Sequence, residues 1–459
     1  MDIGTNDNAT PPSSDGAKTH YRGNPWFFVP SISLWSGMVN VVLFNVPTAM
    51  LKDLGYSNVF IGLSSLITIP YALKFLWGPV IDAISTKRKW ILRTIEIQLL
   101  LWAAMVFLLV TSHFTVAIFF GILFLVSLSK SPQEIALVGF YLVSLTKSDQ
   151  ARFIGIRPLT SRLAMVFTGS LLLGMAGIFG KVAGDGDMRY TWGFYFLCLL
   201  AVYAIGYLWT QTSCPYPIGD KALPRAPGQG IWNNLKEPFV ALLKIKYIGL
   251  AVLFILFIRS GEAFIHRMVV PFYMDPPESG GYGADLAQVG FIGMIGLIGA
   301  SAGAVISGFA IKKYGLRRIM LPFVAAAIFP SLIYTALAVW HVEWSMTFDL
   351  TGIGINYKTD LNIALSFGAL VENFGYGLGY SAAEYFLFSL SRGKYQTSIA
   401  GFLLSILYIV VLVFGAISGW VQSLSGWGWF FVISVLVSIP VFLVLPRLRY
   451  VDEETSKAS

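Results

Sequence analysis

Several charged side chains lie within long apolar stretches of the sequence, where a membrane or a protein core would surround them. Lys130 and Glu134 are four residues apart, and Arg259, Glu262 and His266 follow one another at spacings of three and four. Residues at such spacings share one face of a helix, so each group predicts a polar stripe. A charge inside an apolar segment is costly unless it has a partner or faces a cavity. The stripes therefore indicate a site for a carboxylate- or hydroxyl-rich solute.

Further apolar stretches contain polar residues that helix packing does not require. Lys74 lies within TIPYALKFLWGP, too deep for its amine to reach the membrane surface easily. Arg162 lies near one end of its stretch and could extend to that surface instead. Glu372 and Asn373 begin a polar run in another stretch, and Asn40 is a neutral hydrogen-bonding residue in the first. All five are candidates for lining a cavity between helices.

The composition shows what kind of protein must position these side chains. The chain has 459 residues, of which 56% are hydrophobic and 12% charged, and its formal net charge is +8. Spanning helices need roughly 20 apolar residues each, so this composition suffices for about twelve. It excludes a soluble enzyme, a disordered chain and a fibrous protein. Cys198 and Cys214 provide neither a disulfide framework nor metal-ligand spacing, and no phosphate-binding loop motif for ATP occurs.

Twelve apolar stretches follow one another, with a longer gap after the sixth. They lie at 26–50, 57–83, 90–111, 114–145, 152–178, 190–211, 247–274, 284–311, 317–342, 361–389, 395–422 and 426–446. Stretches of this length are too long for barrel strands, so they predict helices. The sequence thus predicts an all-α polytopic membrane protein with twelve transmembrane helices in two six-helix bundles.

The domain organisation follows from the same pattern. We expect a flexible tail at 1–25, an N-terminal bundle at 26–211, a Pro- and Lys-rich linker at 212–246, a C-terminal bundle at 247–446 and a second tail at 447–459. Most of the 32 Lys and Arg residues fall in the tails and in every second connector. By the positive-inside rule, both tails and the linker are cytoplasmic. The connector at 343–360 is then external.

The two predicted bundles share one short motif at their cytoplasmic ends. Each copy has a glycine, a charged residue four positions later and then a basic pair, and the motif residues are Gly78, Asp82, Lys87 and Arg88 in the first copy, and Gly308, Lys312, Gly315, Arg317 and Arg318 in the second. The pattern resembles the loop signature of the major facilitator superfamily, which implies the major facilitator fold and a cytoplasmic gate at these residues. The positive-inside charge by itself could also produce such a pair of motifs.

Four patches resemble a narrower group, the AmpG-type muropeptide permeases, with the acetyl-coenzyme A transporters as distant relatives. They are YALKFLWGP at 71–79 followed by Asp82, SPQEI at 131–135, RSGEAF at 259–264 and ENFGYGLG at 372–379. Arg162 matches a further arginine of the family. The resemblance implies a proton-coupled symporter of the bacterial inner membrane, a monomer without cofactors, which imports saccharide-containing solutes such as anhydro-muropeptides.

The resemblance and the polar residues together assign roles within a central cavity. We expect solute binding by Lys74, Lys130, Arg162, Arg259, Asn40, Tyr71, Gln133, Asn373 and Tyr376. We expect proton coupling by Glu134, Glu262, Glu372 or His266, because a carboxylate or an imidazole in a cavity can take up and release a proton. Lys130 and Glu134 could instead form a purely structural pair, the aromatic residues could serve only packing, and sodium could replace the proton.

One departure from the family pattern concerns the substrate. Family members usually carry a second acid four residues after the position of Glu134, whereas Val138 stands there in this sequence. The chain could therefore import another oligosaccharide or a sugar acid. A polytopic membrane transferase or a non-transporting receptor are the alternatives from other classes. The longest connector carries no acid-rich or histidine-rich cluster of the kind such enzymes use.

Overall fold

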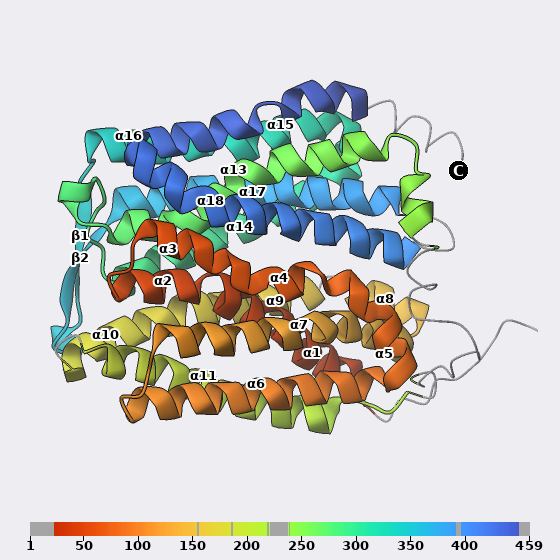
Figure 1. Cartoon of the computed structure of the whole chain (residues 1–459), viewed down its shortest axis with the longest axis horizontal. Coiled ribbons are helices and arrows are strands. Elements are labelled where there is room, and N and C mark those ends of the chain that lie inside the picture. The colour runs from red at the N-terminus through yellow and green to blue at the C-terminus, as the bar shows by residue number, and fades with distance from the viewer. Residues whose placement is uncertain are drawn as a thin grey trace, which may run out of the picture.

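The computed structural model describes residues 23–153, 156–184, 187–217, 220, 237, 239–391 and 396–448. Long helices run side by side along one direction (Figure 1). A β-hairpin, α10 and α16 lie at the left end, and α5 and α8 lie at the right end. We call these the hairpin end and the α8 end.

The N-terminal half, coloured red to yellow-green, forms the lower part of Figure 1. Its helices are α1 (Pro25–Phe44), α2 (Val46–Asp53), α3 (Asn58–Leu63), α4 (Ile69–Ala72), α5 (Gly78–Ile84), α6 (Lys87–Val110), α7 (Val116–Ser144), α8 (Lys147–Phe153), α9 (Ile156–Val166), α10 (Leu172–Gly184) and α11 (Met188–Ser213). A π-helical turn at Phe167–Leu171 connects α9 to α10.

The C-terminal half, coloured green to blue, forms the upper part. Its elements are α13 (Ile248–Met274), α14 (Leu286–Tyr314), α15 (Leu316–Ile328), α16 (Leu332–Trp340), β1 (Ser345–Asp349), β2 (Lys358–Asn362), α17 (Ile363–Leu390) and α18 (Gln396–Ser438). A positive φ of 69° at Gly426 divides α18 into two helical parts. Glycine tolerates this backbone conformation because it has no Cβ atom.

Ten helical stretches among the described residues are long and apolar enough to cross a membrane. One of them, Ser398–Leu448, has 51 residues and contains the break at Gly426, whereas the 28-residue α17 is not among the ten. The chain is thus an all-α polytopic membrane protein. The number of twelve spans and the cytoplasmic position of both termini stay predictions.

The stretch at 57–83, expected as one helix, is divided into five short helical pieces. Between α3, α4 and α5 lie two 3₁₀ turns, Ser64–Thr68 and Lys74–Trp77. Pro70 and Pro79 occupy the second positions of α4 and α5. Proline has no backbone N–H to donate, so it restarts a helix more easily than it continues one. Lys74 consequently lies in an irregular segment rather than in the middle of a regular helix.

The connector at 343–360 contains a β-hairpin that the sequence analysis did not predict. β1 and β2 pair antiparallel, with Thr347 opposite Asp360 and Phe348 opposite Thr359. A two-stranded hairpin is marginal in isolation. This one is supported by α14, because Gln288 Nε2 donates to Thr359 Oγ1 at 3.0 Å and to the Asp360 carbonyl at 2.8 Å.

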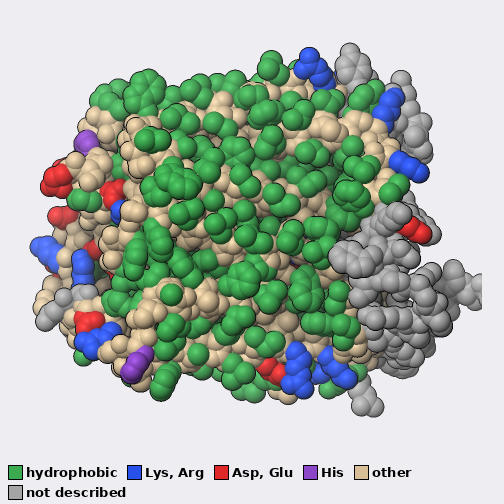
Figure 2. All heavy atoms as spheres, in the orientation of Figure 1, with side chains coloured by type: hydrophobic (Ala, Val, Ile, Leu, Met, Phe, Trp, Pro, Cys, Tyr) green, Lys and Arg blue, Asp and Glu red, His purple; other side chains and the backbone are tan. Residues whose placement is uncertain are grey.

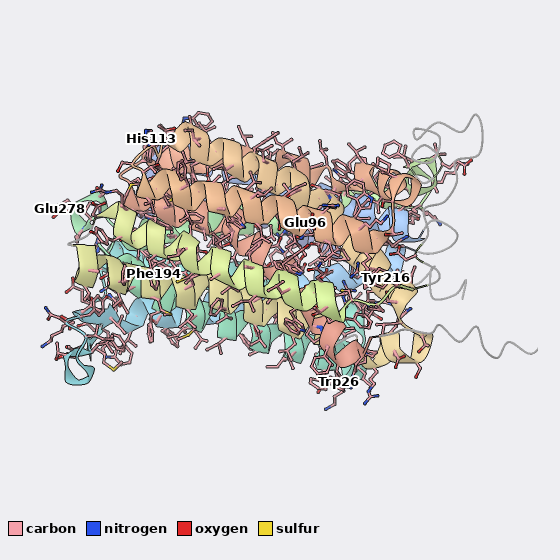
Figure 3. The ribbon with its side chains drawn as sticks, turned by 90° about the horizontal axis from the view of Figure 1, so that it is seen from below. Trp26, Glu96, His113, Phe194, Tyr216 and Glu278 are labelled. Carbon is pink, nitrogen blue, oxygen red and sulfur yellow. The ribbon has the colours of Figure 1, made fainter. Side chains whose placement is uncertain are left out.

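The visible surface fits a membrane environment. Hydrophobic side chains cover its middle, while charged side chains gather towards the two ends (Figure 2). On α6, Leu100 and Val110 are each 72% exposed, which is favourable only if lipid covers them. Seen from below, His113 and Glu278 lie at the hairpin end, whereas Trp26 and Tyr216 lie towards the α8 end (Figure 3).

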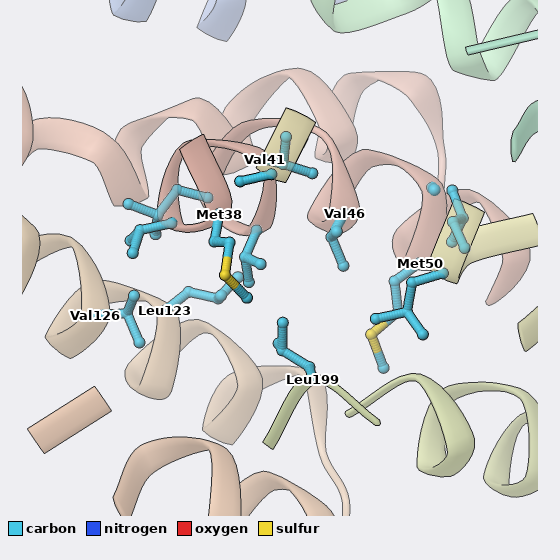
Figure 4. Packing of buried hydrophobic residues seen from close by; sticks show 14 of the residues in the cluster. Met38, Val41, Val46, Met50, Leu123, Val126 and Leu199 are labelled. Carbon is cyan, nitrogen blue, oxygen red and sulfur yellow. The ribbon is translucent and has the colours of Figure 1, made fainter. Parts of the chain in front are cut away.

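Two buried hydrophobic clusters form the interior of the two halves. One fills the N-terminal half, where Met38 of α1 lies close to Leu123 of α7, and Leu199 of α11 lies below α1 and α2 (Figure 4). That cluster continues into residues of the C-terminal half near the hairpin end, among them Phe272, Trp427 and Phe431. The second cluster lies mainly within the rest of the C-terminal half. The halves therefore share a core at the hairpin end.

Candidate solute site

The N-terminal half presents an ion pair on α7. Lys130 Nζ lies 2.6 Å from Glu134 Oε2, and the Lys130 side chain is fully buried. Ser36 of α1 donates its hydroxyl to both carboxylate oxygens, at 3.1 and 3.2 Å, and its backbone carbonyl accepts from Lys130 Nζ at 3.3 Å. Glu134 remains 21% exposed. This pair can hold a solute hydroxyl or exchange a proton at its open side.

Lys74 is buried between two tyrosines from different halves. Its Nζ lies 4.8 Å from the ring centre of Tyr71 and 4.5 Å from that of Tyr408 on α18. The two rings meet edge to face at 4.8 Å. Cation–π contacts stabilise an ammonium without neutralising it. Among the described residues no carboxylate forms an ion pair with Lys74, so its charge stays available to an anionic group.

The C-terminal half presents a second ion pair, on α13. Arg259 Nη1 lies 2.5 Å from Glu262 Oε2. The Arg259 guanidinium also lies 4.9 Å from the Tyr380 ring and 6.0 Å from the Tyr376 ring, and these two rings of α17 stack at 5.3 Å. Aromatic faces beside polar groups suit the apolar face of a sugar ring.

Glu372 is a third acid in this half and is 7% exposed. Asn373 Nδ2 donates to Glu372 Oε2 at 2.8 Å and to the Ala369 carbonyl at 3.0 Å. Among the described residues no cation forms an ion pair with Glu372. It therefore differs from Glu134 and Glu262, which each have a basic partner in their own helix.

Glu384 is a site residue that the sequence analysis missed. It lies half-buried on α17 and interacts electrostatically with Arg162 and Lys74 of the N-terminal half and with Arg259. The signal was present in the sequence, because Glu372, Tyr376, Tyr380 and Glu384 are spaced by four. Residues at that spacing lie along one row of a helix. Tyr408 gave a weaker signal, a single tyrosine in an apolar run.

The remaining predicted binding residues differ in position. Gln133 is fully buried, with Gln98 Nε2 donating to Gln133 Oε1 at 3.3 Å, so it packs between α6 and α7 instead of facing the site. Asn40 is half-buried, and its Oδ1 has no partner among the described residues. His266 is exposed on the same stripe of α13 as Arg259 and Glu262, which indicates open space beside that stripe.

The first copy of the gate motif contacts the start of the linker. Asp220 accepts the backbone N–H groups of Lys87 and Arg88, at 2.7 and 3.0 Å, and so caps α6. Arg88 donates to the carbonyls of Gln211 and Cys214, and its guanidinium lies 4.0 Å from the Tyr216 ring. The side chain of Asp82, and most of 212–246, lie outside the described residues.

The second copy has a different arrangement. Gly315 ends α14 with a φ of 77°, a conformation that favours glycine. Lys312, Arg317 and Arg318 are exposed, and a Cβ atom at Gly308 would meet nothing within 4 Å. This copy is therefore a cationic surface at the α8 end, which is the end predicted to be cytoplasmic.

The ion pairs that the described residues form between the halves lie at the hairpin end. Lys52 of α2 forms an ion pair with Asp275 at the end of α13. Asn58 Nδ2 donates to Asp275 Oδ2 at 3.0 Å and to Gln422 Oε1 at 2.9 Å, and Trp427 Nε1 donates to Asp275 Oδ2 at 3.1 Å. Asp275 thus joins α2, α3 and α18.

A second connection lies beside the hairpin. Lys181 of α10 lies 2.5 Å from Asp285, which precedes α14, and Tyr357 donates to the same carboxylate at 3.3 Å. Glycines also allow close approach of the backbones, because a Cβ atom at Gly290 would lie 2.7 Å from Gly174 of the other half. These contacts close the hairpin end.

No metal site accompanies this arrangement. Among the described residues, no group of three or more His, Cys, Asp and Glu side chains lies close enough to hold a metal ion. The site contains an ion pair within each half and Lys74 between two tyrosines. It also contains Glu372, which has no cation partner among the described residues, and the oppositely charged Arg162 and Glu384. Such groups can bind a polar, charged solute and a proton.

Relatives found by sequence cover most of this chain. The protein named putative transporter AmpG 1 of Rickettsia bellii is 24% identical over 403 residues, which covers 85% of this chain and 89% of that protein. The anhydromuropeptide permease of Escherichia coli is 24% identical over 404 residues and covers 86% and 74% of the two chains. No family model matches the chain.

Solved structures confirm the fold. A single-residue mutant of the nucleoside transporter NupG superposes with a TM-score of 0.67 at 14% identity, covering 92% of this chain and 99% of that one. A bacterial homologue of the human lysosomal transporter Spinster, in an inward-facing conformation, gives a TM-score of 0.65 at 12% identity over 93% and 96%. These relatives are transporters and not enzymes. The chain is a polytopic membrane protein with the major facilitator fold, and its homologues over most of its length are AmpG-type permeases.

Proposed function

We propose that the protein is a proton-coupled secondary transporter that imports a saccharide-containing solute related to the anhydro-muropeptides. The observation that carries this proposal is the placement of Lys74, with its charge unneutralised, between Tyr71 and Tyr408 at the contact of the two halves. A solute held there touches both halves. Rocking of the halves about such a site is how this fold moves solutes.

The chemistry of the site supports a sugar with an anionic group. Lys74 and Arg162 provide positive charge, and Tyr376 and Tyr380 provide stacked aromatic rings. Ser36 and Asn40 provide hydrogen-bonding groups. The relative from Escherichia coli is named an anhydromuropeptide permease, which supports a saccharide-containing solute for this chain.

Glu372 is the acid to which we assign the coupled proton. It is buried and has no cation partner among the described residues, so a proton removes a charge that nothing else offsets. Glu134 and Glu262 are neutralised by their helical neighbours Lys130 and Arg259. Coupling follows if the proton changes the relative stability of the two conformations.

The positive-inside rule places the α8 end in the cytoplasm, and for a bacterial chain the membrane is the inner membrane. We propose a monomer, because each half completes the site of the other within one chain. With the hairpin end closed, we assign this conformation as the one closed towards the outside.

The test is uptake of labelled anhydro-muropeptide into proteoliposomes under an imposed inward proton gradient. We expect accumulation by the wild type, and in Glu372→Gln a loss of accumulation with exchange of labelled solute retained. Glu262→Gln is the matched control, and it should lose exchange as well, because Arg259 is left unpaired in the site. Full gradient-driven accumulation by Glu372→Gln would assign the proton to another group. Absence of any uptake by folded wild type would favour another oligosaccharide or sugar acid, which a panel of such solutes then tests.

A further inference from the structure

The charges at the contact between the halves do not all find partners in this conformation. Lys130 pairs with Glu134 inside the N-terminal half, and Arg259 pairs with Glu262 inside the C-terminal half. Both pairs stay intact when the halves move relative to one another. They therefore cannot distinguish one conformation of the protein from another.

Arg162, Lys74 and Glu384 behave differently. Within the described part of the chain, none of them forms an ion pair, although Glu384 interacts electrostatically with both cations across the contact between the halves. Glu384 and Arg162 are half-buried and Lys74 is buried, and charges that lack a direct partner inside a membrane protein are costly. A movement that brings them together would be favourable.

The positions of Glu384 and Arg162 identify that movement. Glu384 lies in the last turns of α17, and Arg162 lies in α9, which begins six residues earlier. The end of α17 and the start of α9 are at the α8 end of the molecule, opposite the hairpin that precedes α17 (Figure 1). Closing the α8 end moves α17 towards α9 and shortens the distance between the two side chains.

The hairpin end shows the same arrangement already closed. There the cation Lys52 belongs to the N-terminal half and the acid Asp275 to the C-terminal half. Arg162 and Glu384 have the same polarity, with the cation again in the N-terminal half. Among the described residues the first pair is formed, whereas no ion pair joins Arg162 and Glu384.

We propose that Glu384 forms an ion pair with Arg162 when the protein closes at the α8 end, and that this pair replaces the Lys52–Asp275 pair in the opposite conformation. Glu384 is thus a positioning residue, and the inference rests on the proposed function, since it requires two alternating conformations. An anionic group of a solute at Lys74 and Arg162 competes with Glu384. Solute binding then opens the α8 end. Import requires this opening, because the α8 end is predicted to face the cytoplasm.

Cysteine labelling tests the pair without any solute. The reporter is Leu286→Cys, a buried position against Gly177 of the other half at the hairpin end, with Cys198 and Cys214 both replaced by serine. A soluble maleimide labels this cysteine only when the hairpin end opens. Asp275→Asn is added to all samples, because loss of the Lys52 partner populates that open state.

In this background we expect Glu384→Gln and Arg162→Gln each to lower the labelling rate by about fivefold or more, the usual scale of a coupling between two conformations. The exchanged pair, Arg162→Glu with Glu384→Arg, should restore the rate. Glu96→Gln is the control acid, since Glu96 contacts Arg93 and Tyr207 within its own half, and it should leave the rate unchanged. Thermal unfolding verifies that every variant is folded.

An unchanged labelling rate in Glu384→Gln, or a failure of the exchanged pair to restore the rate, would overturn the proposal. The outcome is independent of the solute assay. If the variants label as expected but the wild type accumulates no anhydro-muropeptide, the Arg162–Glu384 pair is supported and the proposed substrate is refuted. If the wild type accumulates the solute but Glu384→Gln does not change the labelling rate, the proposed function is supported and the Arg162–Glu384 pair is refuted.

Discussion

Lys52 and Asp275, which are far apart in the sequence, form a nearly buried ion pair that joins the two halves at the hairpin end, with side-chain exposures of 14% and 8%. The carboxylate of Asp275 also accepts hydrogen bonds from Asn58 and Trp427. Removal of one partner of such a pair leaves the other charge buried and unpaired. Loss of this acid should therefore weaken the closed arrangement of the hairpin end.

Asp275→Asn should open the hairpin end. In the Leu286→Cys reporter described above, we expect labelling to increase by at least about fivefold, because the closed state loses an ion pair that the open state does not contain. Asp349→Asn, at an exposed acid of the β-hairpin, is the control. Equal labelling of the two variants would show that Asp275 does not hold the closed state.

The two ion pairs that the described residues form between the halves should differ in strength. Lys181 is 50% exposed in its pair with Asp285, and exposed pairs contribute about 0–1 kcal/mol. Lys181→Gln should therefore change labelling only slightly, whereas Lys52→Gln should resemble Asp275→Asn. Raising the salt concentration should weaken the Lys181 contact selectively. A larger effect from Lys181→Gln than from Lys52→Gln would contradict this ranking.

The Lys130–Glu134 pair should be important for stability as well as for transport. Glu134→Gln leaves Lys130 buried with an uncompensated charge, which costs about 3–5 kcal/mol. Thermal unfolding in detergent should show a clear decrease in midpoint. The double variant Lys130→Met with Glu134→Gln removes both charges, so its unfolding midpoint should recover most of the loss. We expect neither variant to transport the solute. A double variant less stable than Glu134→Gln would contradict the argument.

Gly37 should tolerate no side chain. A Cβ atom there would collide with the backbone carbonyl of Ser161 on α9, next to Arg162. Gly37→Ala should therefore separate α1 from α9 and cost about 1–3 kcal/mol. Gly193→Ala is the matched control, because a Cβ atom there meets nothing within 4 Å. It should be neutral or stabilise the helix by up to about 1 kcal/mol. Equal midpoints for the two variants would refute this close contact.

The sequence by itself determined the membrane class, the helical fold and the polar stripes. Apolar length and hydrogen-bond satisfaction in lipid leave few alternatives to helices, so composition is decisive. Spacing along one helix is equally direct, and the pairs Lys130–Glu134 and Arg259–Glu262 are both formed as that spacing implies.

The tertiary structure decided what lies across from each stripe. The sequence does not show that Lys74 meets Tyr408, that Gln133 turns towards Gln98, or that Glu384 interacts electrostatically with Arg162. These relationships join helices that are distant along the chain, and they depend on helix rotation and on close backbone contacts such as Gly37 against Ser161. A periodicity fixes which residues share a face, whereas only packing fixes which face meets which.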